Sequence, residues 1–175
     1  MEQPITTTST KGVMIALILV VLALASYFLD MKANGPLQWL GYAVFIGGII
    51  WSIMSYGKQI NHNSTFGNYF AHGFKVAALV TAIMIIYVIA FIFIFPDFKE
   101  KAIDEARKSM ESKNNLTQEQ ITAGLDMTRK FFMVFLVGGT LLGYLFFGAL
   151  ASLIGAAVTK KEPNNFAGDI NQIGQ

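Results

Sequence analysis

Five polar side chains that can carry or exchange a proton lie close together near the middle of the sequence. They are Lys58, His62, Thr65, His72 and Lys75. The group contains no carboxylate, and it therefore lacks the usual partner for general acid–base catalysis. Its two histidines are the only ones in the chain, and no third ligand stands at a metal-binding spacing. We interpret these residues as parts of a polar loop and an interface, and we expect no enzyme activity, no cofactor and no metal.

The composition excludes several other kinds of site. The chain has no cysteine, which rules out a thiolate nucleophile, a disulfide and a cysteine-ligated metal. Its net charge is only +2 and it has no glycine-rich phosphate loop, so we expect no nucleic-acid partner. Charged residues make up 14% of the chain, against about 25% in soluble domains. They are gathered in patches between long apolar segments, which is typical of a membrane protein.

Four apolar segments are long enough to cross a bilayer, which takes roughly 20 residues. They are residues 12–29, 37–56, 69–95 and 131–158. Polar and apolar residues do not alternate in them, so they predict helices and not barrel strands. No segment has a charge at its centre, which disfavours proton-coupled transport. Aromatic residues near the segment ends are typical of interfacial belts, among them Tyr27, Trp39 and Tyr42.

The sequence thus predicts an all-α membrane protein with a four-helix transmembrane domain over residues 12–158. Residues 1–11 are expected to form a flexible N-terminus, and residues 159–175 a flexible C-terminal tail. The first segment has a competing interpretation as a cleaved signal peptide, because Ala23-Leu24-Ala25 is similar to a cleavage site. Cleavage would leave three spans. Because the apolar run continues to Leu29, we expect the helix to be retained.

Residues 96–130, between the third and fourth spans, predict an amphipathic helical hairpin outside the membrane. Asn114-Asn115 marks the turn, and Thr117 with Gln120 has the pattern of a capping box. One interpretation is a docking element for a partner. The other is two amphipathic helices that bury their apolar faces on each other. The segment is longer than a simple connection requires.

The distribution of basic residues bears on orientation. With four spans the two termini lie on the same side. Counting Lys and Arg gives five on the terminal side and eight on the other, which favours termini outside. Most of the eight belong to the single loop 96–130, whereas Lys11 precedes the first span and Lys160-Lys161 follow the last. We expect both termini to be cytoplasmic.

Small residues recur along single faces of the predicted spans, where they allow helix backbones to approach closely. They indicate either packing within the chain or an interface with another subunit. The predicted packing positions are Gly41, Gly48, Ser52, Gly139, Gly143, Gly148 and Gly155.

The stretch from Tyr56 to Lys75 carries the run Thr65-Phe66-Gly67, then Phe70, then Gly73-Phe74. This run, with the helix plan around it, resembles bacterial membrane proteins of the domain of unknown function 4199 family over about residues 10–160. The resemblance implies an inner-membrane protein that keeps its first helix, and it implies no biochemical activity. The residues themselves suggest structural roles. Thr65 can cap the third helix, Phe66 and Phe70 can anchor at the interface, and Gly67 and Gly73 permit tight turns or close helix contacts. A binding role for this motif is the alternative.

Two functions follow as expectations. The first is a non-catalytic scaffold or accessory subunit in the lipid bilayer, which associates with itself or with a membrane-protein partner through the 96–130 hairpin. The alternative is a small oligomeric transporter or channel for a small solute, with Ser52, Thr81 and Thr140 as its polar lining.

Overall fold

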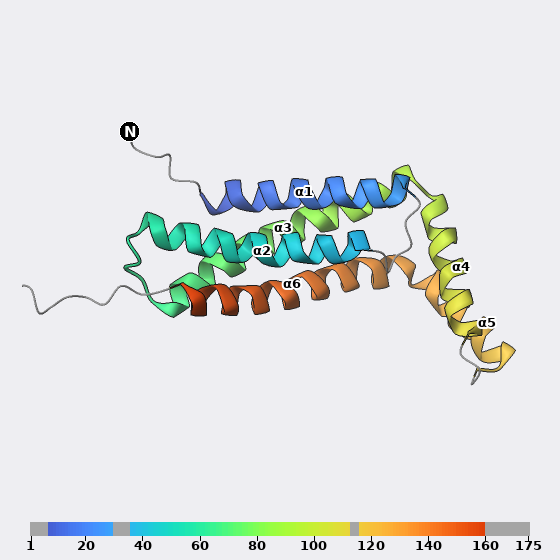
Figure 1. Cartoon of the computed structure of the whole chain (residues 1–175). Helices are drawn as coiled ribbons and strands as arrows, with labels where there is room; N and C mark the ends of the chain where they lie inside the picture. Colours follow the sequence, from blue (N-terminus) through green and yellow to red (C-terminus); the bar gives the residue numbers. More distant parts are fainter. Residues whose placement is uncertain (1–6, 30–35, 113–115, 160–175) are drawn as a thin grey trace, which may run out of the picture.

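The computed structural model describes residues 7–29, 36–112 and 116–159, and within these ranges the chain forms six helices and no strands. Of these, the four long helices lie side by side, and the two shorter ones turn away at one end (Figure 1). In chain order they are α1 (Thr8–Phe28), α2 (Pro36–Gln59), α3 (Phe66–Ile94), α4 (Asp97–Glu111), α5 (Gln118–Lys130) and α6 (Phe132–Val158).

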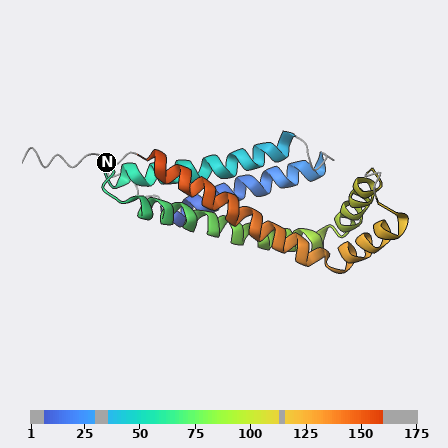
Figure 2. The same ribbon diagram turned by 90° about the horizontal axis from the view of Figure 1, so that it is seen from below.

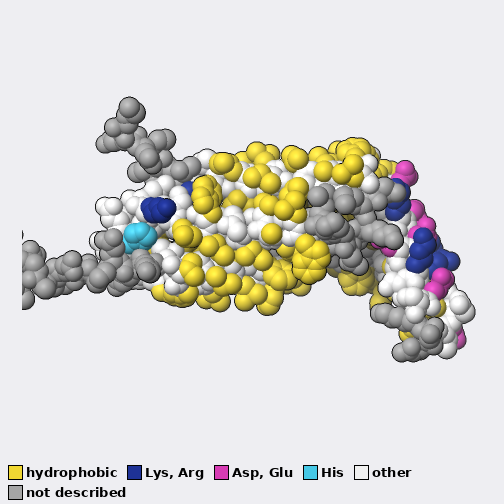
Figure 3. All heavy atoms as spheres, in the orientation of Figure 1, with side chains coloured by type: hydrophobic (Ala, Val, Ile, Leu, Met, Phe, Trp, Pro, Cys, Tyr) yellow, Lys and Arg dark blue, Asp and Glu magenta, His cyan; other side chains and the backbone are white. Residues whose placement is uncertain are grey.

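The four long helices are long and apolar enough to cross a membrane, as their sequences predict. They are α1, α2, α3 and α6. Apolar side chains cover the side of the bundle seen in Figure 3, and the charged side chains of that face lie toward its two ends. An apolar belt between charged ends is the surface that a multi-pass membrane protein presents to lipid.

The first helix begins earlier than its apolar run indicates. Thr7 caps it, and its side chain accepts a hydrogen bond from the backbone N–H of Thr10. Helix α1 therefore starts at Thr8 and not at residue 12, which places Lys11 in its first turn. The rest of the predicted flexible termini, residues 1–6 and 160–175, lies outside the described residues.

Glycines hold α3 and α6 close together, and this is the most extensive pairing among the described helices. A β-carbon added to Gly148 would lie 2.5 Å from Ala77 Cβ. One added to Gly155 or to Gly73 would lie 2.5 Å from Ile53 Cδ1 on α2. At Gly148 the neighbouring atom is a β-carbon, which cannot rotate away, whereas at Gly73 and Gly155 it is the end of the buried Ile53 side chain, which would have to shift. The glycines therefore allow the three helices to lie at this separation.

Three other glycines of the predicted packing faces do not make such contacts. At Gly41, Gly139 and Gly143 an added β-carbon would meet no atom within 4 Å. The small-residue pattern of α6 thus divides into a packed half around Gly148 and Gly155 and an open half around Gly139 and Gly143.

Helices α4 and α5 pack against each other through a small core of their own. Ile103, Ile121 and Leu125 are buried in it, with Ala106 and Met110 beside them. The predicted capping box is confirmed, since the Thr117 side chain accepts from Gln120 N–H and the Gln120 side chain accepts from Thr117 N–H. The predicted turn at 114–115 lies outside the described residues.

The bundle is not equally tight along its length. At the end that carries the α2–α3 connection, the four long helices lie close together (Figure 2). Toward the end that carries α4, the pair α1 and α2 diverges from the pair α3 and α6. Between the two pairs lies a space whose lining includes Phe98 and Lys101 of α4.

Candidate functional site

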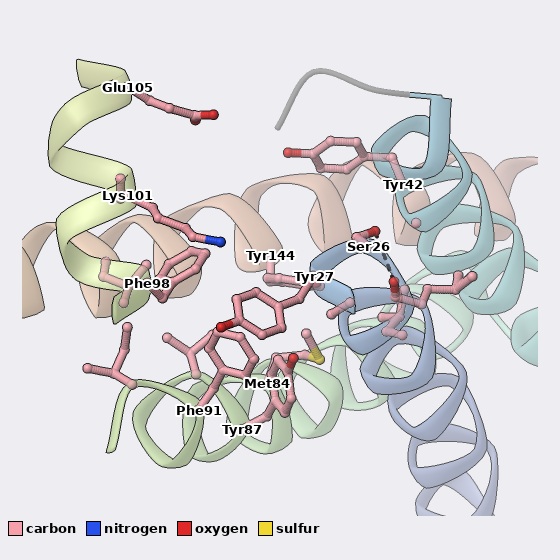
Figure 4. Close-up of a pocket in the computed structure, with 18 of the residues that line it drawn as sticks. Ser26, Tyr27, Tyr42, Met84, Tyr87, Phe91, Phe98, Lys101, Glu105 and Tyr144 are labelled. Atoms are coloured by element: carbon pink, nitrogen blue, oxygen red, sulfur yellow. Dashed lines mark hydrogen bonds between the residues drawn. The ribbon is translucent and has the colours of Figure 1, made fainter. Parts of the chain in front are cut away.

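The space between the two helix pairs is a cleft of about 730 Å³, a volume within the usual range for small-molecule sites. Its walls come from α1, α2, α3, α4 and α6 (Figure 4). Leu19, Ala23 and Ser26 line it from α1, and Gly41 lines it from α2. Most of the surface around it is apolar. We call it the main cleft.

Aromatic rings form much of this wall. Tyr27, in the last turn of α1, meets Phe91 of α3 edge to face, with ring centroids 5.0 Å apart. Phe91 in turn meets Phe98 of α4 at 5.3 Å, again edge to face. Deeper in the bundle, Phe45 and Tyr144 form a third such pair at 4.9 Å. Edge-to-face pairs fix ring orientation, so these rings give the cleft a defined shape.

The polar part of the cleft lies on α4. Lys101 and Glu105 are four residues apart and therefore share one helical face, which is the face toward the cleft. Lys101 points inward, with its Nζ 5.7 Å from the centroid of the Tyr27 ring (Figure 4). Glu105 extends from α4 toward the same edge of the cleft as the hydroxyl of Tyr42 on α2. The cleft is thus apolar inside and charged at one edge.

The fold explains this arrangement. Helix α3 ends at Ile94, and after Phe95 and Pro96 the chain turns into α4. One face of α4 carries apolar residues that pack on α5, and a neighbouring face lies over the opening between the helix pairs. The amphipathic α4 therefore places charges where the apolar bundle ends.

A second group of polar side chains lies at the opposite, tight end of the bundle. Lys11 is fully buried, and its Nζ donates to Ser55 Oγ at 2.9 Å and to the Ser52 carbonyl oxygen at 3.3 Å. Ser52 Oγ lies 3.1 Å from His72 Nε2, and Thr8 Oγ1 lies 3.4 Å from His72 Nδ1. These bonds join α1, α2 and α3, and we call the group the Lys11 network.

The structure does not gather the five polar residues singled out in the sequence. His72 alone belongs to the Lys11 network, where its ring stacks on Tyr56 with centroids 4.3 Å apart. Lys58, Thr65 and Lys75 are exposed. None of the five lines the main cleft. His72 is therefore a buried partner of serine and threonine hydroxyls at one end of the bundle.

The Thr65–Gly73 motif has structural roles at the start of α3. The Thr65 side chain accepts from Asn68 N–H, which confirms the predicted cap. Phe66 is exposed, and Phe70 stacks on Phe74. Gly73 makes the close contact with Ile53 described above. Gly67 has only Thr65 Oγ1 near its added β-carbon, at 4.0 Å.

The residues proposed to line a solute pathway do not come together in either of the two cavities described for this structure. Ser52 and Thr81 are buried, and Thr81 Oγ1 donates to the Ala77 carbonyl of its own helix. Neither lines the main cleft. Thr140 donates to the Leu136 carbonyl and lines a smaller cavity beside α2.

Sequence reasoning missed the main cleft and the Lys11 network. The aromatic residues near the helix ends, among them Tyr27 and Tyr42, could have pointed to the cleft. The same pattern also describes an interfacial belt, so it did not distinguish the two. No feature of the sequence indicated that Lys11 is buried, because it directly precedes the apolar run, and a lysine at the end of a spanning helix usually extends its side chain to water.

A family model described as a protein of unknown function (DUF4199) matches residues 10–161 of the chain. No curated protein and no solved structure matches it. The match covers α2 to α6 in full and all of α1 except its first two residues. The chain, a multi-pass membrane protein with an all-helical bundle, therefore belongs to the DUF4199 family.

Proposed function

We propose that this protein is a non-catalytic membrane protein that binds an amphipathic, lipid-like molecule in the main cleft and acts as an accessory subunit or scaffold. The observation that carries the proposal is the cleft itself, which is about 730 Å³ in volume, aromatic inside and charged on α4.

The polarity of the cleft matches that of a membrane lipid. Its inner wall consists of residues from the apolar helices that form the spans, such as Met84 and Tyr87 of α3. Its charged edge, with Lys101 and Glu105, belongs to the helix that directly follows the end of α3. A lipid in a bilayer has the same order along the membrane normal, with chains in the apolar layer and a charged head group at the interface. A lysine ammonium has three N–H donors and a full positive charge, so it can attract a phosphate or carboxylate in addition to a partner that it already has.

Filling the cleft is expected to remove the bound lipid. Gly41 lines the cleft and its added β-carbon meets no atom within 4 Å, so tryptophan in Gly41→Trp extends into the cleft without a clash at its base. Native mass spectrometry of the detergent-extracted protein should show lipid retained by the wild type and about tenfold less retained by this variant, the effect expected of overpacking an occupied site.

The matched control is Gly47→Trp on the same helix. Gly47 also has no atom within 4 Å of its added β-carbon, but it does not line the cleft. This variant should retain lipid as the wild type does. The proposal is wrong if the wild type retains no lipid, or if Gly41→Trp retains as much lipid as the wild type and Gly47→Trp do. Lys101→Gln should reduce retention of lipids with anionic groups, whereas Arg107→Gln, an exposed position on α4 that does not line the cleft, should not.

We further infer that α4 and α5 form a hairpin outside the membrane, on the side opposite the termini, where it is available to a protein partner. Since the chain has no native cysteine, single cysteines report topology directly. Asn63→Cys, in the α2–α3 connection, is expected to react with a membrane-impermeant maleimide from the cytoplasmic side only. Ala123→Cys, exposed on α5, is expected to react from the opposite side only. Labelling of both from one side contradicts this topology.

A further inference from the structure

A smaller cavity of about 330 Å³ lies between α2 and α6. Gly139, Thr140 and Gly143 line it from α6, and the rings of Phe135 and Phe147 stand beside them. We call it the side groove. Its lining is apolar apart from Thr140 and the two tyrosines that it shares with the main cleft, and the Thr140 hydroxyl is bonded to its own helix.

The side groove adjoins the main cleft. Tyr42, Phe45, Leu136 and Tyr144 line both. Phe45 and Tyr144, which form an edge-to-face pair, therefore belong to a wall that the main cleft and the side groove share. The two spaces therefore lie next to each other, and the charged residues of their lining lie on α4.

The side groove is open because α6 has glycines at a level where no neighbouring helix contacts them. At Gly139 and Gly143 nothing lies within 4 Å of an added β-carbon, whereas Gly148 on the same helix has Ala77 Cβ at 2.5 Å. The chain itself therefore fills the space at one half of α6 and leaves it open at the other. In lipid, an open apolar groove is occupied by whatever apolar chain fits it.

We propose that the ligand of the main cleft is a two-chain phospholipid, with one acyl chain in the main cleft, the second in the side groove, and the phosphate-bearing head group beside Lys101. This inference rests on the proposed function and specifies the class of lipid. The two adjoining apolar spaces carry it, since a single chain would occupy one of them and leave the other unfilled.

The side groove suits a slim chain better than a helix of a second copy. A helix with side chains is about 10 Å across. The glycines permit close approach of a backbone, but Phe135 is 57% exposed and Phe147 is 37% exposed beside them. The ring of Phe147 also contacts that of Tyr42, with centroids 5.5 Å apart. These rings hold a partner helix away from the glycines, whereas a flexible acyl chain passes between them.

The test compares lipids that share a head group and differ in chain number. The full-length protein is extracted, delipidated by detergent exchange and mixed with equal amounts of a diacyl phosphatidylethanolamine and its single-chain lyso form. Native mass spectrometry then gives the ratio of the two bound species. We expect the wild type to prefer the diacyl form and Gly139→Leu, which fills the side groove, to lower the diacyl-to-lyso ratio about tenfold.

The neighbouring glycine supplies the matched control. Gly138 also has no atom within 4 Å of its added β-carbon, but it lines neither cavity. Gly138→Leu should keep the wild-type ratio, and Gly143→Leu should reproduce the effect of Gly139→Leu. Both test glycines have open space around them, so these variants are expected to fold.

Other outcomes overturn the inference in distinguishable ways. If Gly139→Leu and Gly143→Leu retain lipid with an unchanged ratio while Gly41→Trp loses it, the cleft binds lipid but the two-chain assignment is wrong. If the wild type retains neither lipid, the proposed function is wrong as well. If Gly139→Leu converts a dimer to a monomer with no change in the ratio, the groove is an interface between copies of this chain.

Discussion

Replacing Gly148 with leucine is expected to destabilise the bundle by about 3 kcal/mol, near the upper end for overpacking a close contact. The added β-carbon alone would lie 2.5 Å from Ala77 Cβ, and the phenyl ring of Phe45 lies 3.5 Å from it. Ala77 has no rotamer that moves its methyl group away, so α3 and α6 must separate. Unfolding in mixed micelles of a mild detergent and sodium dodecyl sulfate, followed by circular dichroism, measures the change.

The control for this prediction is Gly138→Leu on the same helix. It makes the same change in residue type, and with it the same gain in helix propensity, at a position with no atom within 4 Å. It should match or slightly exceed the stability of the wild type. Equal stability of Gly148→Leu and Gly138→Leu would show that α3 and α6 are not held at the separation described here.

Replacing Lys11 with alanine is expected to cost about 3 kcal/mol, comparable to truncating a buried methionine or leucine. Lys11 is fully buried, so the truncation leaves a cavity. It also removes the two hydrogen bonds from Nζ to Ser52 and Ser55, which join α1 to α2. Relief of the desolvated ammonium offsets part of this loss. The same mixed-micelle unfolding experiment measures the effect.

Two further variants separate packing from charge at this position. Lys11→Met keeps most of the buried volume and should lose less stability than Lys11→Ala. Lys75→Ala removes a lysine that is exposed on α3 and should change stability little. If Lys11→Ala and Lys75→Ala unfold at the same detergent composition, Lys11 does not fasten α1 to the bundle.

These two positions lie in the tight part of the bundle, and their roles explain how the cleft can exist. Glycine contacts hold α3 against α6, and the Lys11 network holds α1 against α2 and α3. With one end fixed in this way, the helix pairs can diverge toward α4 without separating (Figure 2). The opening between them is where the proposed lipid binds.

The amino-acid sequence by itself determined the number of long helices, their approximate bounds and several of their ends. Apolar run length sets which segments can span a bilayer, and local hydrogen bonding sets the caps at Thr65 and Thr117. The apolar face of α4, with Ile103 buried, also follows from periodicity, because that helix has a polar face against which the apolar face stands out.

Only the tertiary structure decided which faces of the long helices meet one another. A membrane-spanning helix is apolar on all sides, since both lipid and protein neighbours favour apolar side chains, so only its small residues mark a packing face, and they do so incompletely. Gly139 and Gly148 are the same residue on the same helix, and one is open while the other is closely packed. Lys11 is buried because α1 begins about one turn before the apolar run. Lys11 is therefore part of the helix, and its side chain is directed toward Ser52 and Ser55. The cleft follows from the angle between helix pairs, which depends on these contacts and not on the composition of any one helix.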